Sequence, residues 1–255
     1  MAEPPADLHT RRPSLPPGAR GPLDAALLTR AAAALGLALT VVEEIDSTNA
    51  ELVRQARTEA GAGDGDDAGH PGLWHPHPGR FDTAGLDRMG DPRRPGETGQ
   101  AGAAGRPGDR PAAVGRVLVA ERQTAGRGRM NRSWQSPPGS GLTVSLLLRP
   151  AVPMARLGWL PLVVGTALVG SLRAGLSVPA ELKWPNDVLV GGNKLAGILA
   201  EVVPGLSAPP SVVVGFGLNV TATADELPPG GTSLLLAGAD PARLDRSALL
   251  ADFLR

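Results

Sequence analysis

The sequence contains no cysteine among its 255 residues. This absence excludes disulfides, a thiol nucleophile and zinc bound by cysteine. The opening Met-Ala-Glu-Pro-Pro-Ala-Asp lacks the apolar run of a signal peptide. No segment reaches the roughly 18 to 20 consecutive apolar residues of a membrane-spanning helix. We therefore expect a cytoplasmic protein with no membrane partner.

The chain also lacks an excess of either charge, since 25 basic residues balance 25 acidic ones. A global attraction to nucleic acid is not expected, so any anion must bind to a local cluster of cations. No Walker A sequence occurs, which excludes a P-loop nucleotide site. His75 and His77 have no further ligand near them in the sequence, so we assign no metal site.

Large aliphatic side chains are nearly missing from two segments. Residues 1–20 are rich in proline and arginine, and we expect a disordered tail there. From about 58 to 113, Gly, Pro, Asp, Ala and Arg dominate, and such a stretch cannot bury enough apolar surface to offset its ordering entropy. The sequence thus predicts one domain over 21–255, interrupted by a disordered insertion at about 58–113.

The apolar spacing of the remainder predicts a mixture of helices and strands. Helices are expected over 23–37, 48–57 and 154–174, and from near Asp245 onward. The helix over 154–174 is apolar nearly all round, which indicates deep burial. Strands are expected over 40–45, 116–120, 142–148, 181–183, 188–190, 195–203 and 211–214. Helices and strands alternate irregularly and several strands are joined by short turns, so the predicted fold class is α+β, a mixed and mostly antiparallel sheet packed with helices.

The segment Gly126-Arg-Gly-Arg129 combines flexible backbone with fixed cations. Its glycines let the backbone approach a ligand, and its arginines offer planar forks suited to phosphate or carboxylate. Gln123 upstream and Trp134 downstream add an amide and an aromatic plane, which an adenine or a ureido ring can use. Taken alone, the tetrapeptide is better explained as a basic surface loop.

A second segment, Lys183-Trp-Pro-Asn-Asp187, has the residues of a tight turn between two strands. A turn between strands does not explain why Lys183, Asp187 and Lys194 are charged residues. Lys183 and Lys194 flank Asp187, and a lysine in a mostly apolar sheet needs an anion nearby. Together, the two segments are typical of a site that holds a carboxylate beside a nucleotide phosphate, as acyl-adenylate formation requires.

Two further segments are less specific. In Ser47-Thr-Asn49, Thr48 and Glu51 have the spacing of a capping box, and a helix N-terminus can also bind polar or anionic groups. Gly215-Phe-Gly-Leu-Asn219 is not a dinucleotide fingerprint, because no third glycine and no helix follow. It predicts either a bend that points Asn219 into a pocket or glycines needed only for packing.

In their order along the chain, these segments and Lys194-Leu-Ala-Gly-Ile resemble the biotin protein ligases. The resemblance covers about 22–57 and 115–255. It implies the biotin/lipoate ligase catalytic-domain fold and a two-step reaction. Biotin, the substrate, and MgATP would give biotinyl-5′-AMP and pyrophosphate, and a lysine of a biotin carrier domain would then attack the adenylate.

The resemblance also implies roles for individual residues. The biotin-binding residues would be Ser47, Thr48, Asn49, Gln123, Arg127, Gly128, Arg129 and Lys194. The nucleotide-binding residues would be Arg127, Arg129, Trp134, Lys183, Asn186 and Asn219. The catalytic residues would be Lys194, Asp187 and Arg127, with Asp187 accepting a proton from the incoming lysine.

The sequence departs from the family in three ways. The insertion expected at about 58–113 is not a usual feature of the family. Residues 1–40 are too short for the winged helix-turn-helix of regulatory members, so we expect a monofunctional enzyme. The small SH3-like domain that usually follows is expected to be absent or truncated. A lipoate ligase or lipoyl transferase and a truncated, non-catalytic biotin-binding fragment remain the alternatives, and a homodimer through a sheet edge remains open.

Overall fold

The structure is a computed structural model that describes residues 20–59, 115–203 and 210–255. The expected tail up to residue 19, His75, His77 and nearly all of the expected insertion lie outside the described residues.

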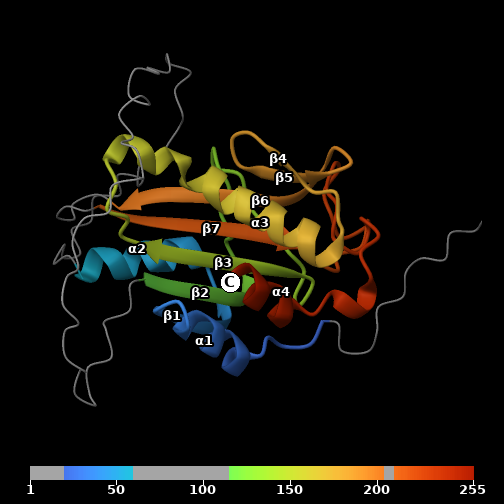
Figure 1. The fold of residues 1–255 in the computed structure, drawn as a ribbon, viewed down its shortest axis with the longest axis horizontal. Helices are drawn as coiled ribbons and strands as arrows, with labels where there is room; N and C mark the ends of the chain where they lie inside the picture. The colour runs from blue at the N-terminus through green and yellow to red at the C-terminus, as the bar shows by residue number, and fades with distance from the viewer. Residues whose placement is uncertain (1–19, 60–114, 204–209) are drawn as a thin grey trace, which may run out of the picture.

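A seven-stranded sheet runs through the described residues in the order β1-β2-β3-β7-β6-β5-β4 (Figure 1). The strands are β1 Leu37–Ile45, β2 Gly115–Gln123, β3 Gly141–Leu148, β4 Glu181–Lys183, β5 Asp187–Val190, β6 Asn193–Val203 and β7 Ser211–Asn219. The β1–β2 pair is parallel and the remaining pairs are antiparallel. The predicted mixed, mostly antiparallel sheet is therefore confirmed.

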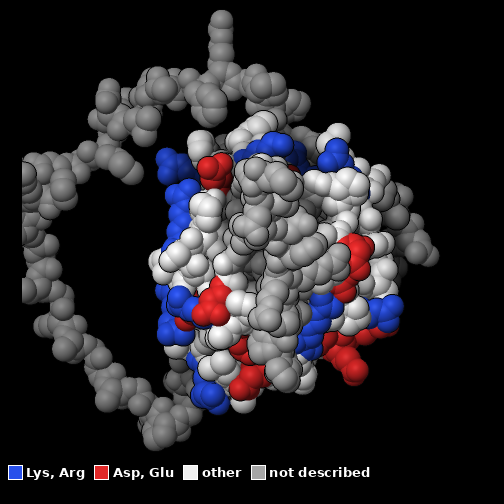
Figure 2. Space-filling model, turned by 90° about the vertical axis from the view of Figure 1, so that its right-hand side faces the viewer, with Lys and Arg blue, Asp and Glu red and all other residues white. Residues whose placement is uncertain are grey.

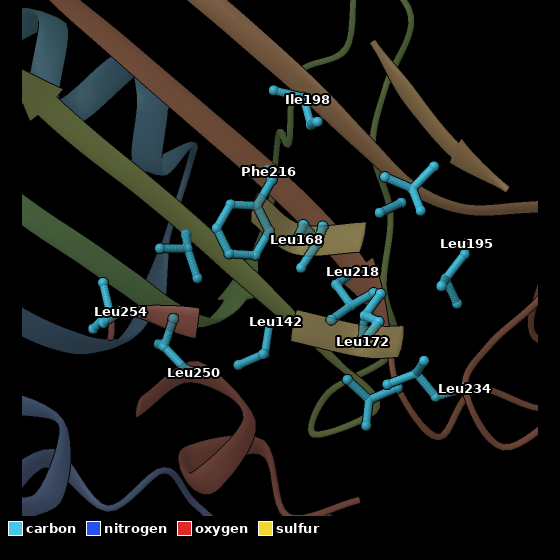
Figure 3. Close-up of a cluster of buried hydrophobic side chains, with 14 of the residues drawn as sticks. Leu142, Leu168, Leu172, Leu195, Ile198, Phe216, Leu218, Leu234, Leu250 and Leu254 are labelled. Carbon is cyan, nitrogen blue, oxygen red and sulfur yellow. The ribbon is translucent and has the colours of Figure 1, made fainter. Parts of the chain in front are cut away.

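Helices cover both faces of the sheet. The helices α1 Ala25–Ala33, α3 Leu160–Leu176 and α4 Arg246–Phe253 pack on one face, and α2 Thr48–Glu59 packs on the other (Figure 1). Side chains alternate along β7, so Val214 and Phe216 enter the larger core while Val213 enters the smaller cluster under α2. Figure 3 shows Phe216 beside Leu168 of α3 in that larger core. Burying a side chain of this size stabilises the fold by roughly 1.5–3 kcal/mol.

The helix α3 is less buried than its sequence predicts. The first turns of the expected helix, Met154–Trp159, form a separate 3-10 helix that precedes α3. Within α3, Val163 is 59% exposed, although Leu168 and Leu172 are buried against the sheet. The prediction of deep burial all round is therefore wrong. In the described part of the chain, the run Met154–Leu176 is the one helix that is long and apolar enough to cross a membrane by length and composition, contrary to the sequence prediction. A helix in the core of a globular protein can be equally long and apolar. Leu168 and Leu172 of α3 are buried against the sheet, as in such a core helix.

Two boundaries also differ from prediction. The first helix ends at Ala33, and Gly36 then adopts a left-handed φ of 69° that lets the chain turn into β1 at Leu37. At the other end of the sheet, β7 does not stop at Val214 but continues to Asn219. Its glycines are therefore strand residues and not a bend.

Candidate functional site

A row of directly paired residues crosses the sheet on the face of α2. Lys183 pairs with Asp187, Asp187 with Gly197, Gly197 with Gly217, and Gly217 with Thr143. Paired residues in a sheet point to the same face, so the charged residues of β4 and β5 stand beside a glycine floor on β6 and β7. Sheet register, rather than closeness in sequence, creates this surface.

A register shift places Lys194 on the same surface. Val188 pairs with Ala196, whereas Leu189 pairs with Lys194, so β6 holds one extra residue there. The Nζ of Lys194 lies 2.7 Å from Oδ1 of Asp187. The predicted pairing of Lys194 with Asp187 is therefore present, and both side chains are partly exposed toward the pocket.

The indole of Trp134 lies against the glycine floor. A Cβ added to Gly217 would lie 2.1 Å from Cε2 of Trp134, and one added to Gly197 would lie 3.4 Å from Cζ3. The ammonium of Lys194 lies 6.0 Å from the ring centroid, within reach of a cation–π attraction. The Nε1–H of Trp134 is buried and has no hydrogen-bond partner within the described residues.

The expected loop over 122–140 contains a small hairpin over residues 126–134, here called the arginine hairpin. The N–H of Gly128 donates to the carbonyl of Arg132 at 2.7 Å. At its tip Met130 and Asn131 have positive φ values of 55° and 57°, as in a type I′ turn. This left-handed conformation is unfavourable for Met130. Its three arginines, Arg127, Arg129 and Arg132, are thus held on a defined backbone.

The side chain of Arg129 joins the arginine hairpin to the turn between β4 and β5. Its Nη1 donates to Oδ1 of Asn186 at 3.1 Å, and Nδ2 of Asn186 donates to the carbonyl of Ile198 at 2.8 Å. The two segments that the sequence singled out are therefore in contact, although about sixty residues separate them.

A polar network lies at the N-terminus of α2. The Oε1 of Gln123 accepts the N–H of Thr48 at 2.8 Å. The Oγ of Ser145 lies 2.7 Å from Oγ1 of Thr48 and 2.6 Å from Oδ1 of Asn49. These groups are buried or nearly so, and together they offer an ordered set of donors and acceptors at one end of the pocket.

The predicted capping box is wrong. Thr48 is already the first helical residue, and Oγ of Ser47 instead accepts the N–H of Ala50 at 3.4 Å. The carboxylate of Glu51 does not reach back, because it accepts from Arg54 at 2.8 Å. The N–H of Thr48 instead donates to the side chain of Gln123 at the end of β2, so a tertiary contact replaces the local motif.

One acid stands at the edge of this network. Asp46 accepts the N–H of Ser47 at 2.7 Å and both arms of the Arg54 guanidinium at 2.9 Å. The hydrogen bonds from Arg54 lower the pKa of Asp46, and those from the Ser47 backbone act in the same direction. Asp46 therefore stays anionic beside the start of α2.

Sequence reasoning missed Glu201. Its side chain is 2% exposed, accepts a hydrogen bond from Nδ2 of Asn49 at 2.8 Å, and lies 3.8 Å from Nη1 of Arg127. The available signal was a lone acid inside the apolar strand sequence Leu-Ala-Gly-Ile-Leu-Ala-Glu-Val-Val.

These elements enclose one cavity of about 450 Å³. It is lined by every predicted site residue except Asn219, namely Ser47, Thr48, Asn49, Gln123, Arg127, Gly128, Arg129, Trp134, Lys183, Asn186, Asp187 and Lys194. The lining residues that the sequence analysis did not single out include Met130, Arg132, Ser133, Val144 and Ser145. The cavity therefore combines an uncharged polar end with a cationic end.

Asn219 lies behind this cavity and not in its lining. It is buried, and its Nδ2 donates to the carbonyl of Thr232 at 2.9 Å. The N–H of Thr232 in turn donates to the carbonyl of Lys194 at 2.9 Å. In this structure Asn219 supports the backbone that carries Lys194 and does not point into the pocket.

Comparison with known proteins agrees with this geometry. The sequence pattern of the family described as "Biotin/lipoate A/B protein ligase family" matches residues 109–219. A protein of Mycobacterium tuberculosis named biotin--[acetyl-CoA-carboxylase] ligase is 48% identical over 145 residues, which are 55% of this chain and 52% of that protein. The bifunctional ligase/repressor BirA of Bacillus spizizenii is 38% identical over 144 residues, 55% of this chain and 44% of that protein.

Among solved structures, the biotin protein ligase from Aquifex aeolicus in complex with biotin and ATP aligns with a TM-score of 0.50 at 26% identity. The alignment covers 85% of this chain and 66% of that one. The chain spans about half the length of the curated relatives that it matches. In sequence over residues 109–219 and in fold, the chain is therefore similar to the biotin/lipoate A/B protein ligase family.

Proposed function

We propose that this chain is a biotin protein ligase. It activates biotin with ATP to biotinyl-5′-AMP and transfers biotin to a lysine of a carrier protein, such as the carrier domain of acetyl-CoA carboxylase. The observation that carries this proposal is a single pocket in which an uncharged polar network adjoins clustered cations. The names of the M. tuberculosis and A. aeolicus relatives support it.

In the first step, a carboxylate oxygen of biotin attacks the α-phosphorus of ATP, the bond to the β-phosphate breaks, and pyrophosphate leaves. Two anions must meet for this attack, so cations placed where they meet lower the barrier. Lys194, Arg127 and Arg129 line the pocket and are suited to that task. The network of Ser47, Thr48, Asn49 and Gln123 is suited to the ureido ring of biotin.

The nucleotide would occupy the opposite end of the pocket. Trp134, Lys183 and Asn186 line the pocket, and Trp134 would offer an aromatic face to the adenine. Asn219 would act on the nucleotide side only through Thr232 and Lys194, because its amide is directed at that backbone.

In the second step, the carrier lysine amine attacks the biotinyl carbonyl, and AMP leaves with the bonding electrons. Asp187, the one carboxylate among the described lining residues, would accept the proton that the amine loses. Until the amine arrives, the ion pair with Lys194 would hold the carboxylate of Asp187 beside the reacting groups. The arginine hairpin lines the pocket and would shield the mixed anhydride from water.

Mg²⁺ is expected to enter with the triphosphate. No cluster of three or more acidic or histidine side chains that could hold a metal occurs in the described ranges, and Asp187 is the one carboxylate in the pocket lining. This donor set fits an ion held mainly by phosphates and water. The Mg²⁺ ion would neutralise the charge of the phosphates when bound.

The test is biotin-dependent pyrophosphate release with MgATP, measured with and without a biotin carrier domain. Release with transfer to the carrier supports a complete ligase. Release without transfer supports a first half-reaction only. Biotin binding without release would support the alternative of a non-catalytic biotin-binding fragment.

A lipoate ligase or lipoyl transferase is the second candidate, because the matching family includes lipoate enzymes. Thermal shift with biotin and with lipoate separates the two, and stabilisation by lipoate alone would reverse the choice. A carrier protein as partner and a cytoplasmic location remain predictions, and homodimerisation stays open. No nucleic-acid partner is expected, and Figure 2 shows basic and acidic side chains interspersed over the visible face.

A further inference from the structure

The carboxylate of Glu201 is buried beneath the pocket in surroundings that do not favour a charge. Its cross-strand partner Val213 and its neighbour on the same face, Val203, belong to the apolar cluster under α2. The side chain of Glu201 is 2% exposed. Burial of a carboxylate is costly, and an apolar residue of similar volume would often serve stability as well or better. Stability alone therefore does not account for this acid.

The two oxygens of Glu201 face two different parts of the site. Oε2 accepts the amide of Asn49 at 2.8 Å, which orients that amide so that its Oδ1 faces Ser145. Oε1 lies 3.8 Å from Nη1 of Arg127, within ion-pair distance but too far for a hydrogen bond. The carboxylate thus attracts the guanidinium without occupying its N–H donors, which stay free for a ligand.

We propose that Glu201 is a positioning residue that holds Arg127 of the arginine hairpin over the pocket, ready to bind the anionic part of the substrate. This inference rests on the proposed function, because it takes biotin as the ligand. Glu201 itself does not touch the substrate and acts through Arg127, while its bond to Asn49 keeps the polar end of the pocket in order.

The burial of the two partners is unequal, and this predicts an unequal response to mutation. Arg127 is 48% exposed, so water can solvate its guanidinium when Glu201 is lost. Glu201 is buried, so loss of Arg127 leaves its charge without a counter-ion. We expect Arg127→Met to lower the melting temperature more than Glu201→Gln does. In the Glu201→Gln background, Arg127→Met should have little effect on melting.

The experiment is a double-mutant cycle of wild type, Glu201→Gln, Arg127→Met and the double variant, with biotin affinity measured by titration calorimetry. Glutamine keeps the size and the acceptor for Asn49 but removes the charge. We expect Glu201→Gln to weaken biotin binding by about fivefold in the presence of Arg127 and by less than about twofold in its absence. Glu226→Gln is the matched control, because that carboxylate pairs with Arg20 outside the pocket and should not change biotin affinity.

Multiplicative effects of the two variants on affinity, or wild-type affinity in Glu201→Gln, would overturn the proposal. If Glu201→Gln does not fold, Glu201→Asp replaces it in the cycle, because the shorter side chain moves the charge away from Arg127. It should weaken biotin binding only where Arg127 is present. Failure of wild type to bind biotin would refute the proposed function instead, and the melting-temperature cycle would still test the pairing.

Discussion

Replacing Gly217 by alanine tests how the floor of the pocket is built. The added Cβ would lie 2.1 Å from Cε2 and 2.3 Å from Nε1 of Trp134, whereas carbon atoms in contact normally lie about 3.5–4.0 Å apart. The ring is rigid, so it must move away by more than about 1 Å. Gly217 is not among the glycines with positive φ, so the alanine backbone is allowed and the contact alone is tested.

We expect Gly217→Ala to lower the free energy of unfolding by about 1–3 kcal/mol, the usual cost of overpacking. The indole should move toward solvent, which shifts its fluorescence to longer wavelength. Biotin-dependent pyrophosphate release should slow in parallel, because Trp134 lines the pocket. Chemical denaturation, tryptophan emission and pyrophosphate release measure the three effects.

The comparison variants make this reasoning refutable. In a Trp134→Ala background the alanine at 217 has no ring to meet, so its cost should nearly vanish. Gly170→Ala on α3, where a Cβ meets nothing within 4 Å, should instead stabilise the fold by about 0.5–1 kcal/mol. An unchanged stability and emission of Gly217→Ala, or an equal cost with and without the indole, would show that the contact is not as described.

Three further perturbations test other parts of the molecule. Lys194→Ala should keep the melting temperature within a few degrees but slow pyrophosphate release by about 10²–10³-fold, since it removes a cation from the point where the two anions meet; near-wild-type release by the folded variant would contradict this. Asn219→Ala should lower the free energy of unfolding by about 1–3 kcal/mol in urea, because the buried carbonyl of Thr232 loses its donor; an unchanged midpoint would count against that contact. Hydrogen bonds from Arg20 lower the pKa of Glu226 from 4.5 to about 2, so this pair stabilises the fold above about pH 4.5 and loses its effect as the pH falls toward 2. Both side chains are partly exposed, so we expect only about 1 kcal/mol, and Arg20→Met should narrow the difference in melting temperature between pH 7 and pH 3.

The sequence contained enough information for the strands and for most of the pocket. Apolar spacing and short turns predicted the strands and a mostly antiparallel sheet. The glycine–cation segments and the resemblance to the biotin protein ligases predicted most of the residues that line the cavity. Each of these signals is local, since it depends on backbone freedom or on charge within a few residues. Predictions from such local patterns hold in the folded protein because they do not depend on contacts with distant residues.

The parts that failed depend on contacts between distant segments. Gly215 and Gly217 indicated a bend by composition, yet they are strand residues whose missing side chains leave room for Asn49 and for the indole of Trp134. Likewise, the predicted Thr48 capping box is replaced by a hydrogen bond that the N–H of Thr48 donates to Oε1 of Gln123, which is 75 residues away. The sequence within either segment does not indicate which distant residue the segment will contact.

Glu201 and Asn219 show how the charged centre is supported from behind. The side-chain amide of Asn219 donates a hydrogen bond to the carbonyl of Thr232, and the N–H of Thr232 donates one to the carbonyl of Lys194. The buried amide of Asn219 thereby fixes the backbone that carries the Lys194 cation. Glu201 does the equivalent for Arg127 through charge. Both supports start from neighbouring central strands, β6 and β7, which are paired on both sides and are therefore rigid. Reacting groups held in this way need little reorganisation when two anions meet, and that is where electrostatic catalysis gains most of its advantage.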